Sequence, residues 1–204
     1  MIRKVNKISI VTKPINSDKI EVNDMSNLEE KYLSRTEIYD GTVLKVVKDK
    51  VLLPDGKEAF REFCLHIGAV CVIAVTSEGK ILMERQYRYA HRRVFFEIPA
   101  GKLDYKGEDL REAAQRELRE ETGATAGKLT YLGHISTSPA LIDERIALFL
   151  AEDLSFGERE LDEDEFLDVE EVELDKLVDM VMSGEIEDSK TQIAILKLSE
   201  LRRR

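Results

Sequence analysis

The sequence predicts an α/β protein in which a mixed sheet lies between helices. Segments with strand character and segments with helical character interleave along most of the chain. Residues 68–75 form a continuous apolar run rich in β-branched side chains, which is typical of a strand buried on both faces. No internal repeat divides the 204 residues, so the length fits one domain, or one domain with a small additional layer.

The N-terminal part predicts an extension followed by a small antiparallel sheet. Residues 1–32 show no clear pattern, and we leave them as an extension of uncertain order. Strand-like alternation begins at residue 33, and strands are predicted at 35–41, 43–53 and 57–65. A Pro-Asp-Gly turn separates the second strand from the third. We therefore expect an N-terminal sheet over residues 33–66 and a second unit over residues 67–204.

The second unit begins with the central strand at residues 68–75. Turn residues, changes of periodicity and the glycines at 123 and 184 divide the rest of this unit into strands and helices. Further strands are predicted at residues 80–86, 94–98, 130–135, 145–151 and 166–174. Helices are predicted at residues 108–122, 175–182 and 189–201, the last of them amphipathic.

Composition excludes several classes of protein. The formal net charge of −10 argues against a general nucleic-acid partner. No apolar run approaches the length of a membrane span, and the N-terminus lacks the apolar core of a signal peptide. Cys64 and Cys71 lack the spacing of a metal or redox pair, and Cys71 is expected to be a buried free thiol. We expect a cytoplasmic protein with no membrane partner.

A cluster of acidic residues marks the predicted helix at residues 108–122. At 3.6 residues per turn, Glu117 and Glu121 lie on one face, with Glu120 beside them. Like charges four residues apart weaken a helix, and a hard divalent ion such as Mg²⁺ would compensate for them. The alternative is an ordinary solvated helix face in an acidic chain. The apolar turn at residues 98–101 and the helix-ending Gly123 favour the metal site.

The stretch from Gly101 to Ala124 resembles the signature of the Nudix hydrolases. Seven residues separate Glu108 from Arg116, which is followed by Glu117 and then by Glu120, Glu121 and Gly123 in the order of the signature. One departure is visible, because six residues separate Gly101 from Glu108 where the signature has five. Loops tolerate such insertions, so the departure affects the path of the loop rather than the helix. The resemblance implies the Nudix α/β/α sandwich with a mixed sheet, beside the N-terminal antiparallel sheet.

The resemblance also implies a set of roles around Mg²⁺, with Mn²⁺ as the alternative ion. Glu117 and Glu121 would coordinate the metal, Glu120 would be an additional ligand with a share in catalysis, and the Ala100 carbonyl would complete part of the shell. Arg116 would hold the carboxylates in place, as a partner of the ligands rather than a ligand itself. The structural positions of the signature would be Gly101, Glu108, Arg116 and Gly123.

Residues outside the signature resemble the ADP-ribose pyrophosphatase branch of this family. The similar segments are residues 66–70, 85–88, 97–104 and 183–191, together with Pro139, sixteen residues after Gly123. The branch implies hydrolysis of the pyrophosphate bond of ADP-ribose, or of a related nucleoside diphosphate sugar, with AMP and ribose 5-phosphate as products from ADP-ribose. Divalent metals assist such a reaction by neutralising the phosphates and activating water.

The acidic run at residues 161–166 contains the candidate base. We expect Glu163 to be the general base and Glu165 a further metal ligand, and the alternative for both is a solvated charge run.

The remaining substrate contacts are carried over from the same branch. Arg88 would bind phosphate through its forked donors, although a surface arginine is the alternative. Pro139 and Glu144 would shape the adenosine or terminal ribose side. Arg61 and Glu62 would come from the N-terminal sheet, in the branch often across a dimer, so a two-fold homodimer formed through that sheet is expected.

Other functions stay open at this point. A nucleotide sugar such as GDP-mannose is the first alternative substrate, and oxidised nucleoside triphosphates are another. A non-hydrolytic, ligand-sensing Nudix-like module is a different class, but such modules usually lose signature carboxylates and gain a DNA-binding domain. This chain keeps Glu117, Glu120 and Glu121 and has no separate basic domain.

Overall fold

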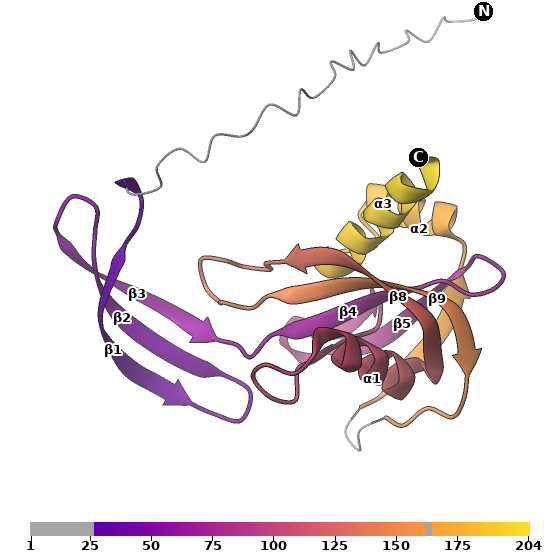
Figure 1. The fold of residues 1–204 in the computed structure, drawn as a ribbon, viewed down its shortest axis with the longest axis horizontal. Coiled ribbons are helices and arrows are strands. Elements are labelled where there is room, and N and C mark those ends of the chain that lie inside the picture. Colours follow the sequence, from indigo (N-terminus) through magenta and orange to yellow (C-terminus); the bar gives the residue numbers. More distant parts are fainter. Residues whose placement is uncertain (1–26, 162–164) are drawn as a thin grey trace, which may run out of the picture.

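The computed structural model describes residues 27–161 and 165–204, and its strands and helices interleave as the sequence predicts (Figure 1). The strands are β1 (Lys31–Asp40), β2 (Lys45–Leu52), β3 (Glu58–Leu65), β4 (Ala69–Ala74), β5 (Ile81–Arg88), β6 (Arg93–Glu97), β7 (Ala100–Lys102), β8 (Ala124–Ile135), β9 (Ile146–Phe156) and β10 (Leu167–Val172). The α-helices are α1 (Leu110–Thr122), α2 (Leu174–Ser183) and α3 (Ser189–Arg203).

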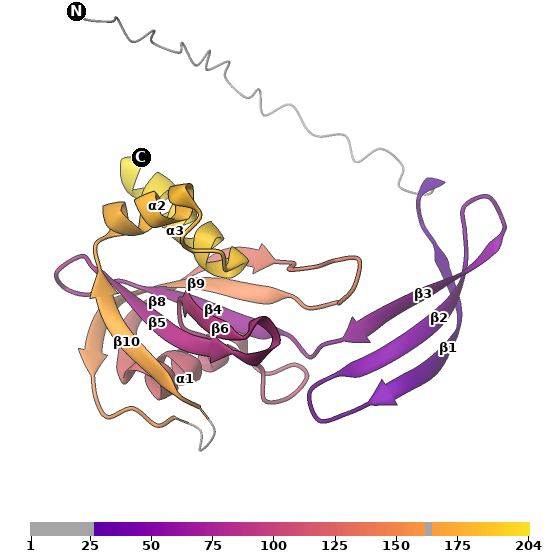
Figure 2. The ribbon, with the colours of Figure 1, turned by 180° about the vertical axis from the view of Figure 1, so that it is seen from behind.

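Within the described residues, the strands form three sheets. The central sheet has the order β7-β4-β9-β8 and is mixed, because β4 runs parallel to β9 while the other pairs are antiparallel. A second sheet, β10-β5-β6, is antiparallel throughout. The third sheet, β1-β2-β3, is the N-terminal one and stands to one side of the rest of the protein (Figures 1 and 2). The mixed sheet is as predicted, and the separate β10-β5-β6 sheet is an addition to it.

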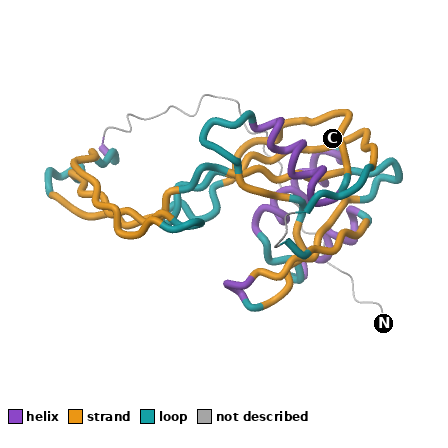
Figure 3. The backbone as a smooth tube through the Cα atoms, turned by 90° about the horizontal axis from the view of Figure 1, so that it is seen from below, coloured by secondary structure: helices purple, strands orange, loops and turns teal. Residues whose placement is uncertain are grey.

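The two faces of β4 pack against different helices. Successive side chains of a strand point to opposite faces, so Cys71 and Ile73 pack with residues of α2 and α3, such as Leu177 and Ile195. Val70, Val72 and Ala74 pack on the other face with Ala113, Ala114 and Leu118 of α1. The sheet therefore lies between helices on both sides, which confirms the predicted α/β/α arrangement. Figure 3 shows the distribution of helices and strands from a third direction.

The thiol of Cys71 is buried in the centre of this sandwich. Both cysteines are free, and Cys71 has no exposed surface while Cys64 is half-buried. Burial raises the pKa of the Cys71 thiol to about 12. The prediction of a buried free thiol is confirmed.

Helix α1 has defined caps at both ends. The Asp109 side chain accepts hydrogen bonds from the backbone N–H groups of Arg111 and Glu112, so the helix begins at Leu110 rather than at the predicted residue 108. At the other end Gly123 adopts a left-handed conformation with φ of 73° and donates its N–H to the Arg119 carbonyl. Strand β8 begins immediately afterwards, six residues earlier than predicted, and the predicted helix is otherwise confirmed.

The N-terminal sheet exposes an unusual amount of apolar surface. All ten residues of β1 are exposed, and the exposed fraction is 57% for Ile38, 58% for Tyr39 and 58% for Phe60. The sheet joins the rest of the protein at the end of β3, where the Cys64 N–H donates to the Leu141 carbonyl at 2.8 Å. Across the described ranges, none of the helices combines the length and apolar character that crossing a membrane requires.

Candidate functional site

Glu121 connects helix α1 to the short strand β7. Its side chain is buried on the face of α1 that packs against the sheet, and its Oε2 accepts a hydrogen bond from the Ala100 N–H at 2.9 Å. The predicted metal ligands Glu121 and Ala100 thus lie in direct contact, although they are distant in the sequence. Strand β7 was not predicted, because three residues between a proline and a loop carry too little pattern.

Glu117 lies one helical turn before Glu121, against Gly101. A Cβ atom added to Gly101 would lie 2.0 Å from the Glu117 carboxylate carbon and 2.0–2.2 Å from its oxygens. Such distances are far inside van der Waals contact, so this position requires glycine for Glu117 to reach β7. The structural position expected for Gly101 therefore has a specific reason in the geometry.

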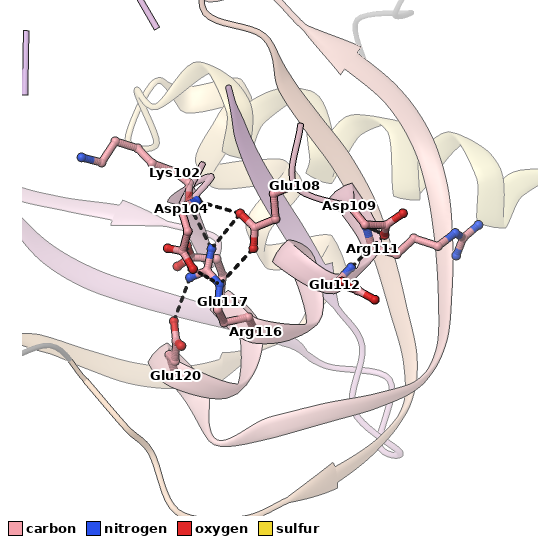
Figure 4. A network of polar contacts seen from close by, with 9 residues as sticks. All are labelled: Lys102, Asp104, Glu108, Asp109, Arg111, Glu112, Arg116, Glu117 and Glu120. Atoms are coloured by element: carbon pink, nitrogen blue, oxygen red, sulfur yellow. Dashed lines mark hydrogen bonds and ion pairs between the residues drawn. The ribbon is translucent and has the colours of Figure 1, made fainter. Parts of the chain in front are cut away.

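Arg116 holds two of the helix carboxylates (Figure 4). Its Nη1 donates to Glu117 Oε1 at 2.8 Å and to Glu120 Oε2 at 3.1 Å. Its Nη2 donates to the Lys102 carbonyl at 3.2 Å, so the guanidinium also ties the helix to β7. Arg116 therefore fixes the orientation of Glu117 and Glu120.

The loop before α1 is closed by the same guanidinium. Glu108 Oε2 accepts the Asp104 N–H at 2.7 Å, and its Oε1 lies 3.4 Å from the Arg116 Nε. The Asp104 carboxylate is also paired with the Arg116 Nε, at 3.3 Å. The loop with one residue more than the signature is thereby fixed at both ends, with Gly107 in a left-handed conformation, φ 91°.

A third buried carboxylate, which the sequence analysis missed, lies on strand β5. Glu84 is 3% exposed, and its Oε1 is buried without a hydrogen-bond partner among the described residues. The available signal was a charged residue directly after the apolar run at residues 81–83, within the predicted strand, but glutamate is seldom fully buried. The structure shows instead that the buried part of β5 continues through Glu84.

These buried carboxylates resist ionisation. Burial, followed by the charges of its neighbours, raises the pKa of Glu117 to about 7 against the opposing effect of Arg116. Burial and then the charge of Glu97 raise the pKa of Glu84, and burial and then the charge of Glu84 raise the pKa of Glu121. Within the described chain Arg116 pairs with Glu117 and Glu120 but with neither Glu84 nor Glu121, so it does not balance the charge that ionisation of those two carboxylates would bring. A divalent cation with carboxylate ligands fits this charge pattern.

The carboxylates are at present held by protein donors rather than arranged around a common point. Arg116 binds Glu117 and Glu120, and the Ala100 N–H binds Glu121. In residues 27–161 and 165–204, no three His, Cys, Asp or Glu side chains are already placed as the ligands of one ion. Coordination of a metal would therefore replace some of these hydrogen bonds.

A cavity of about 380 Å³ opens beside this group. Five of the predicted site residues, Ala100, Gly101, Arg88, Glu144 and Glu165, line it together with the unpredicted Lys190. Glu163, the predicted base, lies outside the described residues.

Glu97 pairs with two cations at the wall of this cavity. Arg88 donates to both of its carboxylate oxygens at 2.8 Å, and the ammonium group of Lys190 is hydrogen-bonded to it as well. Lys190 also lies 3.1 Å from Asp188 at the start of α3. Burial acts against ionisation of Glu97, but Arg88 and Lys190 hold its pKa below the usual value. Lys190 was missed because its sequence neighbours give no sign that it is buried.

The other predicted substrate residues line a second cavity, of about 450 Å³. Arg61, Glu62 and Pro139 all contribute to it, at the junction of the N-terminal sheet with the loop after β8. Arg61 is paired with Glu30, and Glu62 lies 3.0 Å from Lys48. Glu144 belongs to the first cavity, where it accepts the Thr137 hydroxyl at 2.7 Å. One chain therefore divides the predicted substrate residues between two cavities.

Comparisons with known proteins show which family and which proteins this chain resembles. A profile of the NUDIX domain matches residues 65–191. An ADP-ribose pyrophosphatase of Bacillus subtilis (strain 168) is 49% identical over 180 residues, which cover 86% of this chain and 97% of that protein. A methanol dehydrogenase activator of Bacillus methanolicus is 46% identical and covers 84% of this chain and 95% of its own length. A crystal structure of an ADP compounds hydrolase shares the fold, with a TM-score of 0.77 at 22% identity over 86% of this chain and 96% of that one.

Proposed function

The chain belongs to the Nudix family of hydrolases, and we propose that it is an ADP-ribose pyrophosphatase that depends on Mg²⁺, with Mn²⁺ as the alternative ion. Water would add across the pyrophosphate bond, so that ADP-ribose gives AMP and ribose 5-phosphate. The observation that carries the proposal is the 49% identity to an ADP-ribose pyrophosphatase over 97% of that protein's length. The buried carboxylates of α1 beside a cavity supply the chemistry that such a reaction needs.

The residues that would hold the ion are Glu117, Glu120 and Glu121, with the Ala100 carbonyl and Glu165 as further ligands. A bound divalent ion neutralises phosphate charge and lowers the pKa of a coordinated water. Arg116 holds Glu117 and Glu120 in place before the ion arrives, and coordination would replace some of these hydrogen bonds. We assign the general base to the segment that contains Glu163, with a contribution from Glu120.

The first cavity is the proposed place of the substrate phosphates. Its volume of about 380 Å³ is in the range of small-molecule sites. Glu97 occupies the Nε and Nη2 of Arg88, which leaves the Nη1 donors for a phosphate oxygen. Lys190 adds a second positive charge at the same wall. Arg88 and Lys190 would therefore draw the diphosphate toward the carboxylates of α1.

The second cavity and the N-terminal sheet support a homodimer. Arg61, Glu62 and Pro139 line a cavity that is separate from the first. The exposed apolar side chains of β1 and β3, including Ile38, Tyr39 and Phe60, are more typical of an interface than of a free surface. We propose that the sheet pairs two copies of the chain, and that Arg61, Glu62 and Pro139 contribute to substrate binding in the dimer. The two free cysteines fit a cytoplasmic enzyme.

Product analysis tests this function. The chain is incubated with Mg²⁺ and a panel that contains ADP-ribose, GDP-mannose and an oxidised nucleoside triphosphate, and products are separated by chromatography. We expect the highest kcat/KM for ADP-ribose, with AMP and ribose 5-phosphate in equal amounts. A preference for GDP-mannose or for the triphosphate would contradict the substrate assignment, and binding of ADP-ribose without turnover would contradict the enzymatic one.

A further inference from the structure

We propose that Glu84 is an additional ligand of the divalent-metal site, supplied by strand β5 rather than by the signature helix. This inference rests on the proposed function, because it concerns the same ion. It adds to the site a residue that lies outside the signature and outside every segment that carried the family resemblance.

The alternation of β5 directs Glu84 toward helix α1. Leu82 packs in the cluster that contains Leu118 of α1, whereas Ile81 and Met83 belong to the cluster on the other face. Residues two apart on a strand share a face, so Glu84 points to the side of Leu82. Glu121 follows Leu118 by three residues and lies on the same side of its helix. The two carboxylates therefore face each other from the sheet and from the helix.

Proximity of the two carboxylates is also evident in their electrostatics. After burial, the charge of Glu84 is the strongest influence that raises the pKa of Glu121. Glu165, at the wall of the first cavity, acts on Glu84 and on Glu121 in the same direction. Glu84 therefore shares the electrostatic environment of the proposed ligands.

The side chain of Glu84 has no direct ion pair in the described chain, and the charges of Lys190 and Arg88 offset its raised pKa only in part. Its Oε1 is buried without a hydrogen-bond partner there, and its residue across the strand pair is another carboxylate, Glu97. Arg88 and Lys190, the nearby cations, are engaged by Glu97. A buried polar group without a partner costs free energy, and a cation shared with Glu121 would remove that cost.

A simple packing role explains these observations less well. An apolar side chain would fill this position without the desolvation cost of a carboxyl group. A protonated Glu84 would need an acceptor for its O–H group and a donor for its carbonyl oxygen, and its buried Oε1 has no hydrogen-bond partner among the described residues. Coordination accounts for the burial, the missing partner and the position opposite Glu121 together.

Direct metal binding tests the proposal without any measurement of turnover. The metal-free full chain is titrated with Mn²⁺ by isothermal calorimetry, and the number of bound ions is confirmed from the electron paramagnetic resonance signal of free Mn²⁺. We expect Glu84→Gln to weaken binding about tenfold or to remove one bound ion. The matched control is Glu170→Gln, which changes an exposed carboxylate on the neighbouring strand β10 and should bind as the unaltered chain does.

A third variant separates this proposal from the proposed function. If Glu121→Gln weakens Mn²⁺ binding while Glu84→Gln leaves affinity and stoichiometry unchanged, Glu84 is not a ligand and the function stands. If neither variant changes binding, the metal site of the proposed function is itself wrong. If Glu84→Gln does not fold, Glu84→Asp is tested in its place, because the shorter side chain draws the carboxylate away from the ion. Weaker Mn²⁺ binding by Glu84→Asp supports the proposal, and unchanged binding overturns it.

Discussion

Gly101 and Glu117 are packed so closely that a Cβ atom on Gly101 would lie 2.0 Å from the Glu117 carboxylate carbon. Gly101→Ala should therefore displace the carboxylate of Glu117 or push β7 away from α1. A displacement on the order of 1 Å in such a site costs about 100-fold in rate. We expect a fall of at least about that size in kcat/KM for ADP-ribose, measured by product formation.

Gly157→Ala is the matched control for this change. A Cβ there would meet only the Gly123 carbonyl, at an ordinary 3.9 Å. Its kcat/KM should stay within about twofold of the unaltered chain, since surface substitutions are usually mild. Equal activity of both alanine variants would show that the position of Glu117 does not matter to the reaction.

Glu121→Gln keeps the shape of a buried side chain and removes its charge. The amide oxygen can still accept the Ala100 N–H, so the fold should be retained. Loss of a neighbouring group that orients a metal ligand lowers metal affinity or activity about 10–100-fold. Loss of the ligand itself should therefore lower kcat by more than this. The melting temperature of the metal-free protein should be equal or higher, because glutamine cannot ionise and so avoids the cost of a buried charge. A large loss of stability at an unchanged rate would contradict a metal role for Glu121.

Arg116→Met removes the cation that Glu117, Glu120 and Glu108 share. Without the guanidinium, the neighbouring carboxylates repel each other with no cation between them. We therefore expect the free energy of unfolding, measured with denaturant, to fall by about 2 kcal/mol. Mg²⁺ should restore more stability to this variant than to the unaltered chain. Arg119→Met, on the exposed face of the same helix, is the control and should change stability by less than about 0.5 kcal/mol.

The raised pKa values of Glu84, Glu117 and Glu121 predict a specific pH dependence for the metal-free protein. Their folded pKa values lie above the ordinary value of 4.5, so the folded state binds more protons than the unfolded state. The stability that these groups contribute is complete below pH 4.5 and is lost as the pH rises through about 7 for Glu117 and higher for the other two.

Added Mg²⁺ should offset this loss, since it favours the ionised carboxylates. The difference in melting temperature between samples with Mg²⁺ and samples with a chelator should therefore increase between pH 5 and pH 8. A difference that stays constant over this range would contradict the assignment of these carboxylates to the metal site.

The exposed face of the N-terminal sheet predicts the effect of a charge on assembly. Ile38→Lys places an ammonium group near the C-terminal end of β1, where 57% of the isoleucine is exposed. If the sheet forms the dimer, the burial of this charge should shift the protein to a monomer in sedimentation velocity. Met182→Lys, at a position that is 73% exposed on α2, should leave the mass unchanged. A monomeric unaltered chain would refute the dimer outright.

The parts of the fold that carry regular patterns were predictable, and the reasons are local. The continuous apolar run predicts β4, and the helical periodicity together with the capping residues predicts α1. Glu117, Glu121 and Arg116 follow from one continuous motif, and a single helix brings them together.

The parts that depend on distant contacts were not predictable. Strand β7 exists because Ala100 to Lys102 pair with β4, and three residues have no periodicity of their own. Glu84 and Lys190 are polar residues whose burial depends on elements far away in the sequence. The separation of Arg61 and Pro139 from Arg88 depends on how the N-terminal sheet is attached, which no local pattern records.

The burial of Cys71 gives the protein an internal reporter of its own unfolding. A thiol with a pKa of about 12 and no exposed surface is protected from alkylating reagents and oxidants as long as β4 is covered on both faces. Cys64 is partly accessible and supplies the baseline of one reactive group. The rate at which a second thiol, that of Cys71, is labelled at neutral pH would therefore report the opening of the central sheet. This rate would be independent of movements in the N-terminal sheet.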